Sequence, residues 1–591
     1  MRSSTWFRRV GQSVPGAAGA VLLFAGCSPD GSSTAAATAA ASTRFATFAD
    51  EYFSALHAAS PTQGTSAGFH QYDARLEDLS AAAVRARADT LHRLQGRLDS
   101  LRAGPLSNDD AIDARMIDGA IRSELLEIET IASWRHNPMG YVGLPGYAID
   151  ALMKRNFAPP AERLRSATAR LRRVPAMLSA MRENVEDPPK EFTDLAMRIA
   201  GGSVGFFQTT VPGWAREAAA GDSLLYREFA AANDSATAAM RAAAEWLRRD
   251  LLPRSKGNYA IGPEVFAAKL RYDEMVDLPL DTLLAIGEAN LTKDHAAFVA
   301  LARRIDPRKT PAQVMASLAD DHPTSAALVP FVRGSLEAAR QFLIDKRIVT
   351  VPSEVRPNVQ ETPPYARSGG FASMDTPGAY ESTATEAFYY VTPPETSWDA
   401  RHVEEHLRLF NPAVTALITV HEAFPGHFLQ FIYAKQFPTK TRKLLFAASN
   451  AEGWAHYSEQ MMIEEGFGGN DLKIRLAQLA EALVRDCRWV VGIKLHTRNM
   501  SVEDGAKCFT QQGFQEPANA YEESRRGAYN PTYLYYTLGK LQIYKLREDY
   551  RRAKGTAYTL QGFHDAFVRQ GGLPIELMRR ILLPGDRSPT L

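Results

Sequence analysis

The stretch HEAFPGHFLQ, which begins at His421, constrains the local backbone more than any other part of this 591-residue chain. On a regular α-helix with 3.6 residues per turn, two histidines six residues apart point about 240° away from each other. Pro425 has no N–H to bond to the carbonyl of His421, and Gly426 tolerates dihedral angles that other residues avoid. The sequence therefore predicts that the helix is broken between His421 and His427, and that the break brings both imidazoles to one side.

Paired imidazoles next to a carboxylate are typical of catalytic zinc sites, which need three protein ligands and one open position for water. The third ligand is expected from a nearby helix, and NAEGWAHYSEQ offers candidates from Glu452 onward. Glu452, His456 and Glu459 share one helix face, which would give a ligand and a second-shell or substrate contact. On their own, His and Glu at such spacings lie mostly on solvated helix faces. The Pro-Gly pair and the Glu-rich helix downstream favour a metal site.

The rest of the chain predicts a mainly α fold with a small β element. Residues rich in Ala, Leu, Arg and Glu favour helix over 43–345, and further helices are expected over 399–434, 472–499, 501–512 and 533–553. Pro-rich residues 348–397 include two strand-like runs, 370–374 and 387–391. No linker is evident, so we expect residues 44–591 to form a single large helical domain around a cleft.

The N-terminus resembles the export signal of a bacterial lipoprotein. Arginines precede a short apolar stretch, and LFAGC ends at Cys27, which would be the lipid-anchored residue after cleavage of a signal peptide over 1–27. Residues 28–43 are expected to form a flexible tether. Plain secretion is the alternative. Of the other two cysteines, Cys487 and Cys508, the sequence leaves open whether they form one disulfide or remain buried thiols.

The two central motifs together resemble the family known as domain of unknown function 885, a zincin-like group related in design to helical gluzincin peptidases. SPTQGTSAGFHQYDARLEDLS and PTYLYYTLGKLQIYKLRED are similar to the N-terminal and C-terminal segments of the family, so the resemblance runs from about Phe45 to the C-terminus. It implies an all-helical metallopeptidase with one zinc ion, held by His421, His427 and Glu452, with Glu422 as the general base.

The resemblance also implies further roles around the metal. Tyr536 in YTLGKL and His496 would stabilise an oxyanion, and packing alone is the alternative for His496. Arg525, in the Glu-x-x-Arg pair with Glu522, would bind a substrate carboxylate or form a structural ion pair. His456, Glu459 and Tyr389 are expected as second-shell or substrate contacts, and residues 387–391 as an edge strand that pairs with an extended peptide.

The resulting expectation is an exported zinc peptidase with a peptide as its partner. A net charge of +1 gives no basic field for nucleic acid, and the membrane would be contacted only through the lipid anchor. One alternative keeps the metal but acts on an amide or ester of a small metabolite, or uses iron, which two imidazoles and a carboxylate also suit. Another is a non-catalytic helical binding lipoprotein. The oligomeric state is left open.

Overall fold

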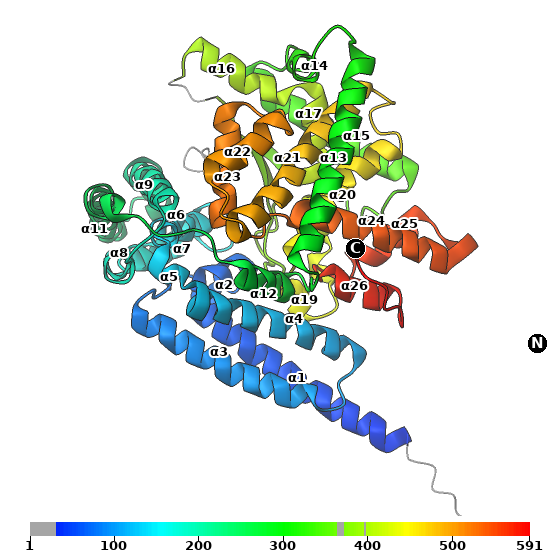
Figure 1. Cartoon of the computed structure of the whole chain (residues 1–591). Helices are drawn as coiled ribbons and strands as arrows, with labels where there is room; N and C mark the ends of the chain where they lie inside the picture. Colours follow the sequence, from blue (N-terminus) through cyan, green and yellow to red (C-terminus); the bar gives the residue numbers. More distant parts are fainter. Residues whose placement is uncertain (1–30, 363–370, 395–397) are drawn as a thin grey trace, which may run out of the picture.

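The computed structural model describes residues 31–362, 371–394 and 398–591, and it is mainly α-helical, as expected (Figure 1). Three long helices lie side by side at one end of the molecule: α1 (Gly31–Ala59), α3 (Ala81–Arg102) and α4 (Asn108–Leu125). The tether predicted over 28–43 is therefore helical from Gly31 onward. The predicted signal peptide and residues 28–30 lie outside the described residues.

A second group of helices encloses a hydrophobic cluster of its own, beside the three N-terminal helices (Figure 1). Its members alternate buried Leu, Ala, Phe and Val with exposed polar residues, which is why each forms an amphipathic helix. They are α6 (Met139–Met153), α7 (Pro160–Leu171), α8 (Val174–Asn184), α9 (Lys190–Gly205), α10 (Val211–Ala219) and α11 (Ser223–Trp246).

The C-terminal half carries the two central motifs and the largest hydrophobic cluster. In its core, α20 (Ala448–Glu464) packs along α24 (Tyr535–Lys554), and α13 (Leu280–Ile305) packs along α21 (Leu472–Thr497). The predicted helices over 472–499, 501–512 and 533–553 are confirmed to within a few residues. The surrounding helices are α12 (Pro263–Asp273), α14 (Pro311–Leu318), α15 (Leu328–Lys346), α16 (Ala400–Leu407), α19 (Lys440–Leu444), α22 (Val502–Gln511), α23 (Pro517–Tyr529), α25 (Leu560–Val568) and α26 (Ile575–Leu582).

The described residues contain one small sheet of three strands, β1 (Asn358–Glu361), β2 (Ala372–Asp375) and β3 (Phe388–Val391). The order is β1-β3-β2, with β3 parallel to β1 and antiparallel to β2. Both runs predicted as strand-like are strands. The prediction that residues 387–391 form a free edge is wrong, because β3 is paired on both sides. Helix α17 (Pro412–Glu422) packs against β2.

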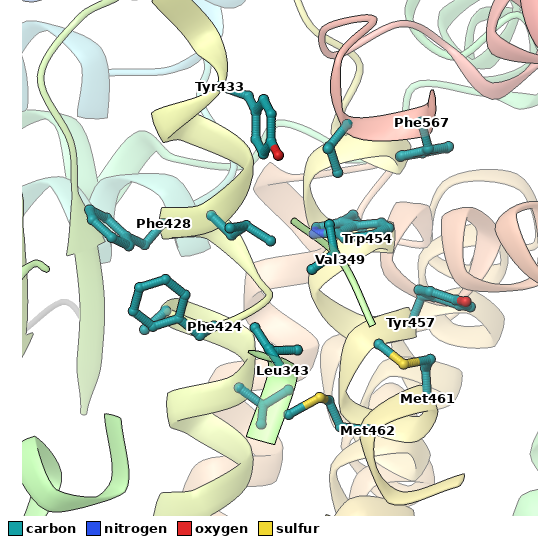
Figure 2. Close-up of a cluster of buried hydrophobic side chains, with 14 of the residues drawn as sticks. Leu343, Val349, Phe424, Phe428, Tyr433, Trp454, Tyr457, Met461, Met462 and Phe567 are labelled. Atoms are coloured by element: carbon teal, nitrogen blue, oxygen red, sulfur yellow. The ribbon is translucent and has the colours of Figure 1, made fainter. Parts of the chain in front are cut away.

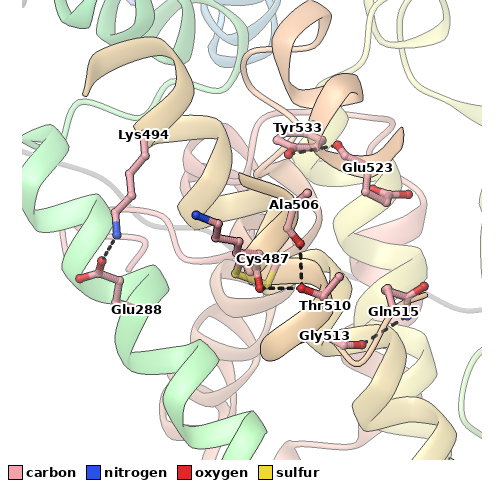
Figure 3. The surroundings of a disulfide bond; sticks show 11 residues. Glu288, Cys487, Lys494, Ala506, Thr510, Gly513, Gln515, Glu523 and Tyr533 are labelled. Carbon is pink, nitrogen blue, oxygen red and sulfur yellow. Dashed lines mark hydrogen bonds and ion pairs between the residues drawn. A yellow bond between two sulfur atoms is a disulfide. The ribbon is translucent and has the colours of Figure 1, made fainter. Parts of the chain in front are cut away.

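Cys487 and Cys508 form a disulfide that joins α21 to α22 (Figure 3). The sequence left this pairing open. Cys487 is fully buried in the hydrophobic cluster around α21, so the bond closes a loop of 21 residues inside a packed region. Within the described residues, no helix combines the length and the apolar character needed to cross a membrane.

Candidate metal centre

The HEAFPGH motif is broken, as its Pro-Gly pair predicts. Helix α17 ends at Glu422 and α18 (His427–Ile432) begins at the second histidine. Between them Ala423 has φ −113° and ψ −83°, the Phe424–Pro425 peptide bond is cis, and Gly426 has φ −66° and ψ −133°. The long helix expected over 399–434 is therefore divided, and the division at the Pro-Gly pair separates the two histidines.

Only glycine fits at the break. A Cβ atom on Gly426 would lie 1.7 Å from the carbonyl oxygen of His421, far inside van der Waals contact. The indole N–H of Trp454 donates to the carbonyl oxygen of Pro425 at 2.7 Å, which ties the break to α20. Figure 2 shows Phe424 and Phe428 on either side of the turn, with Trp454 across from them on the neighbouring helix. The turn is thus held in place from both helices.

The break brings three candidate ligands together. His421, His427 and Glu452 each offer one ligand atom, and these three atoms all lie within 4.8 Å of one another. Among the described residues, this is the cluster of potential metal ligands that could hold an ion. Glu452 Oε2 lies 3.5 Å from His421 Nε2 and 3.4 Å from His427 Nε2, and the two rings are nearly perpendicular, at 88°. The convergence predicted from the sequence is therefore present.

These spacings suit a tetrahedral cation. Zinc bonds of about 2.0–2.1 Å at tetrahedral angles separate neighbouring ligand atoms by about 3.4 Å. A charge-assisted hydrogen bond would be shorter, at about 2.7–2.9 Å. In addition, Glu452 Oε2 is buried and has no hydrogen-bond partner, an arrangement that costs free energy unless a ligand satisfies the atom. Two neutral imidazole nitrogens and one carboxylate oxygen thus fit a zinc ion and leave a fourth position.

Glu459 orients the first imidazole. Its Oε1 accepts from Nδ1 of His421 at 2.7 Å, and its Oε2 contacts Nδ1 of His456 at 3.1 Å. When Nδ1 of His421 carries the proton, its Nε2 lone pair faces Glu452. A carboxylate behind a ligand histidine in this way fixes the tautomer and raises ligand basicity. The structure therefore places Glu459 and His456 directly behind the candidate ligands, as the shared helix face suggested.

The electrostatics of the trio favour a positive charge at its centre. Burial opposes protonation of His421, but the neighbouring carboxylates of Glu452 and Glu459 outweigh burial and raise its pKa to about 10. Burial likewise penalises the charge on Glu452, yet His427 and His421 hold its pKa well below the usual range. A metal must displace protons from the imidazoles to bind. The carboxylates that attract those protons would attract the metal in the same way.

Glu422 lies beside the trio and next to β2. Burial raises the pKa of its carboxyl, while the nearby His427 and His421 oppose that rise. The backbone N–H of Met374 bonds to the Glu422 carboxylate, which places β2 against the candidate general base. The end of β2 is fixed by Asp375, which pairs with Lys154 and Arg155, both at 2.9 Å. No local sequence signal predicts the ion pairs of Asp375, because Asp375 and Arg155 lie 220 residues apart in the chain.

Two glycines bring the tyrosine helix close to the ligand helix. A Cβ on Gly453 would lie 2.5 Å from the Cα of Gly539, and one on Gly539 would lie 1.9 Å from the carbonyl oxygen of Ser449. Helices α20 and α24 can approach this closely only because neither residue has a side chain. The approach brings Tyr536 within electrostatic range of Glu452, and burial together with that carboxylate raises the pKa of Tyr536 to about 12.

Three arginines surround the ring of Tyr536. The guanidinium carbons of Arg488, Arg526 and Arg485 lie 4.9, 5.8 and 5.9 Å from the ring centre, and Arg526 donates to the phenol oxygen at 3.1 Å. Cation–π contacts of this kind stabilise a ring in one orientation. The phenol is protonated at neutral pH and points its hydroxyl toward the Arg526 side of the site. No sequence motif singles out any of these three arginines.

A cavity of about 330 Å³ opens near the N-terminus of α20. It is lined by Ala448, one turn before Glu452 on α20, and by Tyr535, the neighbour of Tyr536. Phe446 also lines the cavity. It is linked to the metal trio through two ring contacts, because His427 stacks on Phe431 and the ring of Phe431 contacts Phe446. None of the three candidate ligands lines this cavity, so a cleft at the metal centre stays a prediction.

Comparison with known proteins agrees with this architecture. A family model described as "Bacterial protein of unknown function (DUF885)" matches residues 61–582. The chain belongs to this family. Among solved structures, a "putative lipoprotein of unknown function" from Shewanella oneidensis is 26% identical, with a TM-score of 0.76 over 91% of this chain and 99% of that one. A "putative lipoprotein" from Colwellia psychrerythraea is 17% identical, with a TM-score of 0.77 over 92% and 98%. A search of curated proteins found no match.

Within this DUF885 chain, three of the residues that the sequence singled out contact the scaffold around the site. His496 Nε2 contacts the carbonyl oxygen of Gly527 at 2.8 Å, and its Nδ1 accepts from the N–H of Ile261 at 3.4 Å. Burial lowers the pKa of His496 to about 4. Because both ring nitrogens contact backbone groups, the structure favours the packing alternative for His496 over the oxyanion role.

Tyr389 and Arg525 also serve the scaffold. Tyr389 is fully buried, and its hydroxyl lies 3.3 Å from that of Thr419 on α17, one turn before Glu422, so it supports the helix and has no surface for a substrate. Arg525 forms an ion pair with Glu522, which also contacts Arg198. Of the two readings of the Glu522–Arg525 pair, the structural ion pair is the one present.

Proposed function

We propose that this protein is a zinc-dependent hydrolase, and most specifically a peptidase. The observation that carries the proposal is the convergence of His421, His427 and Glu452 with ligand-atom spacings of about 3.4–3.5 Å and with Glu422 beside them. A purely structural metal site has no use for an additional carboxylate at the open position. Neither the family description nor the names of the related structures states an activity, so the site alone supports the reaction.

The chemistry assigns a distinct task to each side chain. When bound, a zinc ion lowers the pKa of water and polarises a carbonyl. Glu422 takes a proton from the attacking water, whose oxygen adds to the peptide carbonyl carbon. Tyr536 donates a hydrogen bond to the oxygen that becomes negative, a contribution of about 3 kcal/mol in comparable sites. The carbon–nitrogen bond then breaks, and Glu422 passes its proton to the departing nitrogen.

A single variant tests the assignment. Glu422→Gln keeps the size of the side chain and removes the base, so we expect the metal content to stay at wild-type level while peptide hydrolysis falls by about 10²–10⁴-fold. The assay is hydrolysis of a peptide library, with and without a chelator, alongside metal analysis of the same preparations. Hydrolysis by Glu422→Gln at the wild-type rate would show that Glu422 is not the base. Absence of hydrolysis in the wild type would instead favour a non-catalytic binding lipoprotein.

We also propose that the protein is exported and anchored through Cys27. The signal-like N-terminus and the two structural relatives that are named as lipoproteins support this location. Metabolic labelling with a radioactive fatty acid is expected to mark the wild type and not Cys27→Ser. Label retained by the variant would contradict the anchor.

A further inference from the structure

His456 lies fully buried behind the candidate metal centre, and one of its two ring nitrogens has no hydrogen-bond partner among the described residues. Nδ1 lies 3.1 Å from Oε2 of Glu459, and Oε1 of the same carboxylate accepts from His421 at 2.7 Å. Arg485 also approaches Glu459, at 3.6 Å from Oε1, so the hydrogen bond at Oε2 comes from His456. The unsatisfied atom is Nε2 of His456.

The contact with Glu459 requires one tautomer of His456. Burial opposes ionisation of Glu459, but Arg485 and the neighbouring histidines outweigh burial and hold its pKa well below the usual range. An ionised carboxylate only accepts hydrogen bonds, so Nδ1 of His456 must carry a proton. Burial and the nearby Lys540 lower the pKa of His456 to about 3, so the ring is neutral and has no second proton. Nε2 is therefore an acceptor that lacks a donor.

Lys540 lies next to this ring. It follows Gly539, the glycine at which α24 meets α20. A Cβ on Gly453 of α20 would lie 3.1 Å from the backbone nitrogen of Lys540, and His456 is one turn beyond Gly453. Among the charged neighbours of His456, Lys540 changes the pKa of the ring more than Glu459 does, although Glu459 lies within hydrogen-bond distance. The ammonium is therefore close to the imidazole.

The ammonium of Lys540 matches the acceptors around it in number. It is buried and makes no hydrogen bond among the described residues, although it has three N–H groups to donate. Oδ2 of Asp294 lies 3.8 Å away. Oδ2 of Asp486 has no partner either, and Lys540 lowers the pKa of this carboxyl against the effect of burial. With Nε2 of His456, three acceptors are available for three donors, and buried polar groups left unpaired cost free energy.

We infer that Lys540 is a positioning residue for the metal centre: its ammonium donates to Nε2 of His456, directly or through one buried water, and keeps the proton on the nitrogen that faces Glu459. With that tautomer fixed, Glu459 holds His421 in the orientation that presents its Nε2 to a metal. This inference rests on the proposed function, because it assigns a support of the same site. Lys540 acts only through His456 and Glu459 and touches neither metal nor substrate.

A positioning role and a purely electrostatic role of Lys540 predict opposite results. A positive charge near a dication repels it, so loss of the charge alone would raise zinc affinity. Loss of the donor instead frees His456 to change tautomer, which loosens Glu459 and lowers zinc affinity. Changes behind a ligand histidine cost about 10–100-fold. In the full-length protein we therefore expect Lys540→Met to bind zinc about 10-fold more weakly than the wild type, measured by competition with a chromophoric chelator.

A second substitution tests whether the effect passes through His456. Asparagine donates to Glu459 from an amide N–H that has no alternative tautomer. In a His456→Asn background, Lys540→Met should therefore change zinc affinity by less than about threefold. Lys545→Met is the matched control on the same helix, because its partner Asp549 keeps two arginines, and it should bind zinc as the wild type does.

Lys540→Gln keeps an N–H donor without the charge and serves if Lys540→Met does not fold. It should bind zinc within about threefold of the wild type, and a loss of 10-fold or more in the folded variant would contradict the donor role.

Each remaining outcome has a definite meaning. Zinc affinity in Lys540→Met at or above the wild-type value would overturn the inference while leaving the hydrolase proposal in place. An equal loss with and without His456→Asn would show that Lys540 acts on the packing of α20 against α24, and would also overturn it. If the wild type binds no zinc, the proposed function fails and this inference fails with it.

Discussion

Replacement of Gly426 by alanine tests whether the broken helix builds the metal centre. The new Cβ would lie 1.7 Å from the carbonyl oxygen of His421, about half the distance of an ordinary contact, and 2.5 Å from the carbonyl oxygen of Val420. Both neighbours are backbone atoms, so the helix end must move by more than 1 Å. His421 and His427 flank this point and would move with it.

The size of the effect follows from the ligand geometry. The three ligand atoms tolerate displacements of only about 0.2 Å before bond lengths leave the zinc range, and a misplacement of about 1 Å can cost 10²-fold in rate. We therefore expect Gly426→Ala to lower zinc affinity at least 10-fold and hydrolysis at least 100-fold, while circular dichroism still reports a helical protein. Zinc affinity is measured by competition with a chromophoric chelator.

A matched substitution controls for the added methyl group. Gly202 lies inside helix α9, and a Cβ there meets nothing within 4 Å. Gly202→Ala should leave zinc affinity unchanged and stabilise the protein by about 0.5–1 kcal/mol, because alanine favours helix over glycine. If Gly426→Ala binds zinc as tightly as Gly202→Ala, the reasoning from the Pro-Gly break is refuted.

Three further predictions follow from other parts of the structure. Glu459→Ala removes the carboxylate behind His421 and should lower zinc affinity about 10–100-fold in the same chelator assay; unchanged affinity would contradict the orienting role. Cys508→Ser opens the disulfide loop to Cys487 and should lower the free energy of unfolding by roughly 3 kcal/mol in urea, whereas no change would show that the bond does not stabilise the fold. The carboxylate of Glu274 accepts from the N-terminal N–H groups of α20, and burial raises its pKa from 4.5 to about 7, so the wild type should lose stability as pH rises through this window. Compared with the wild type, Glu274→Gln should be equally stable at pH 4.5 and more stable by on the order of 3 kcal/mol at pH 8. Parallel profiles of unfolding free energy against pH for both proteins would contradict this account.

The sequence predicted the parts of the site that depend on local backbone chemistry. Pro425 and Gly426 act on their own neighbours, so the break could be inferred without any knowledge of the fold. Glu452 and Glu459 lie on one face of one helix, and helical periodicity places them together. The family resemblance then selected Glu452 as the ligand, and the structure brings this residue to the two histidines.

The remaining contacts depend on tertiary packing, which has no local signal. The strand order of the sheet places β3 between two partners. Its four aromatic and β-branched residues suit an edge strand and a central strand equally well. His496 resembles a catalytic residue until its two backbone partners are known. The close approach at Gly453 and Gly539 joins helices about 90 residues apart, and a lone glycine in a helical stretch does not reveal its neighbour.

Metal analysis of the purified protein tests the central claim most directly. The wild type, loaded with zinc and dialysed, should contain one zinc ion per chain, and variants that replace His421, His427 or Glu452 by alanine should each contain almost none while remaining folded. A wild type without bound metal, or zinc retained at full occupancy in all three variants, would show that these residues do not form the metal centre.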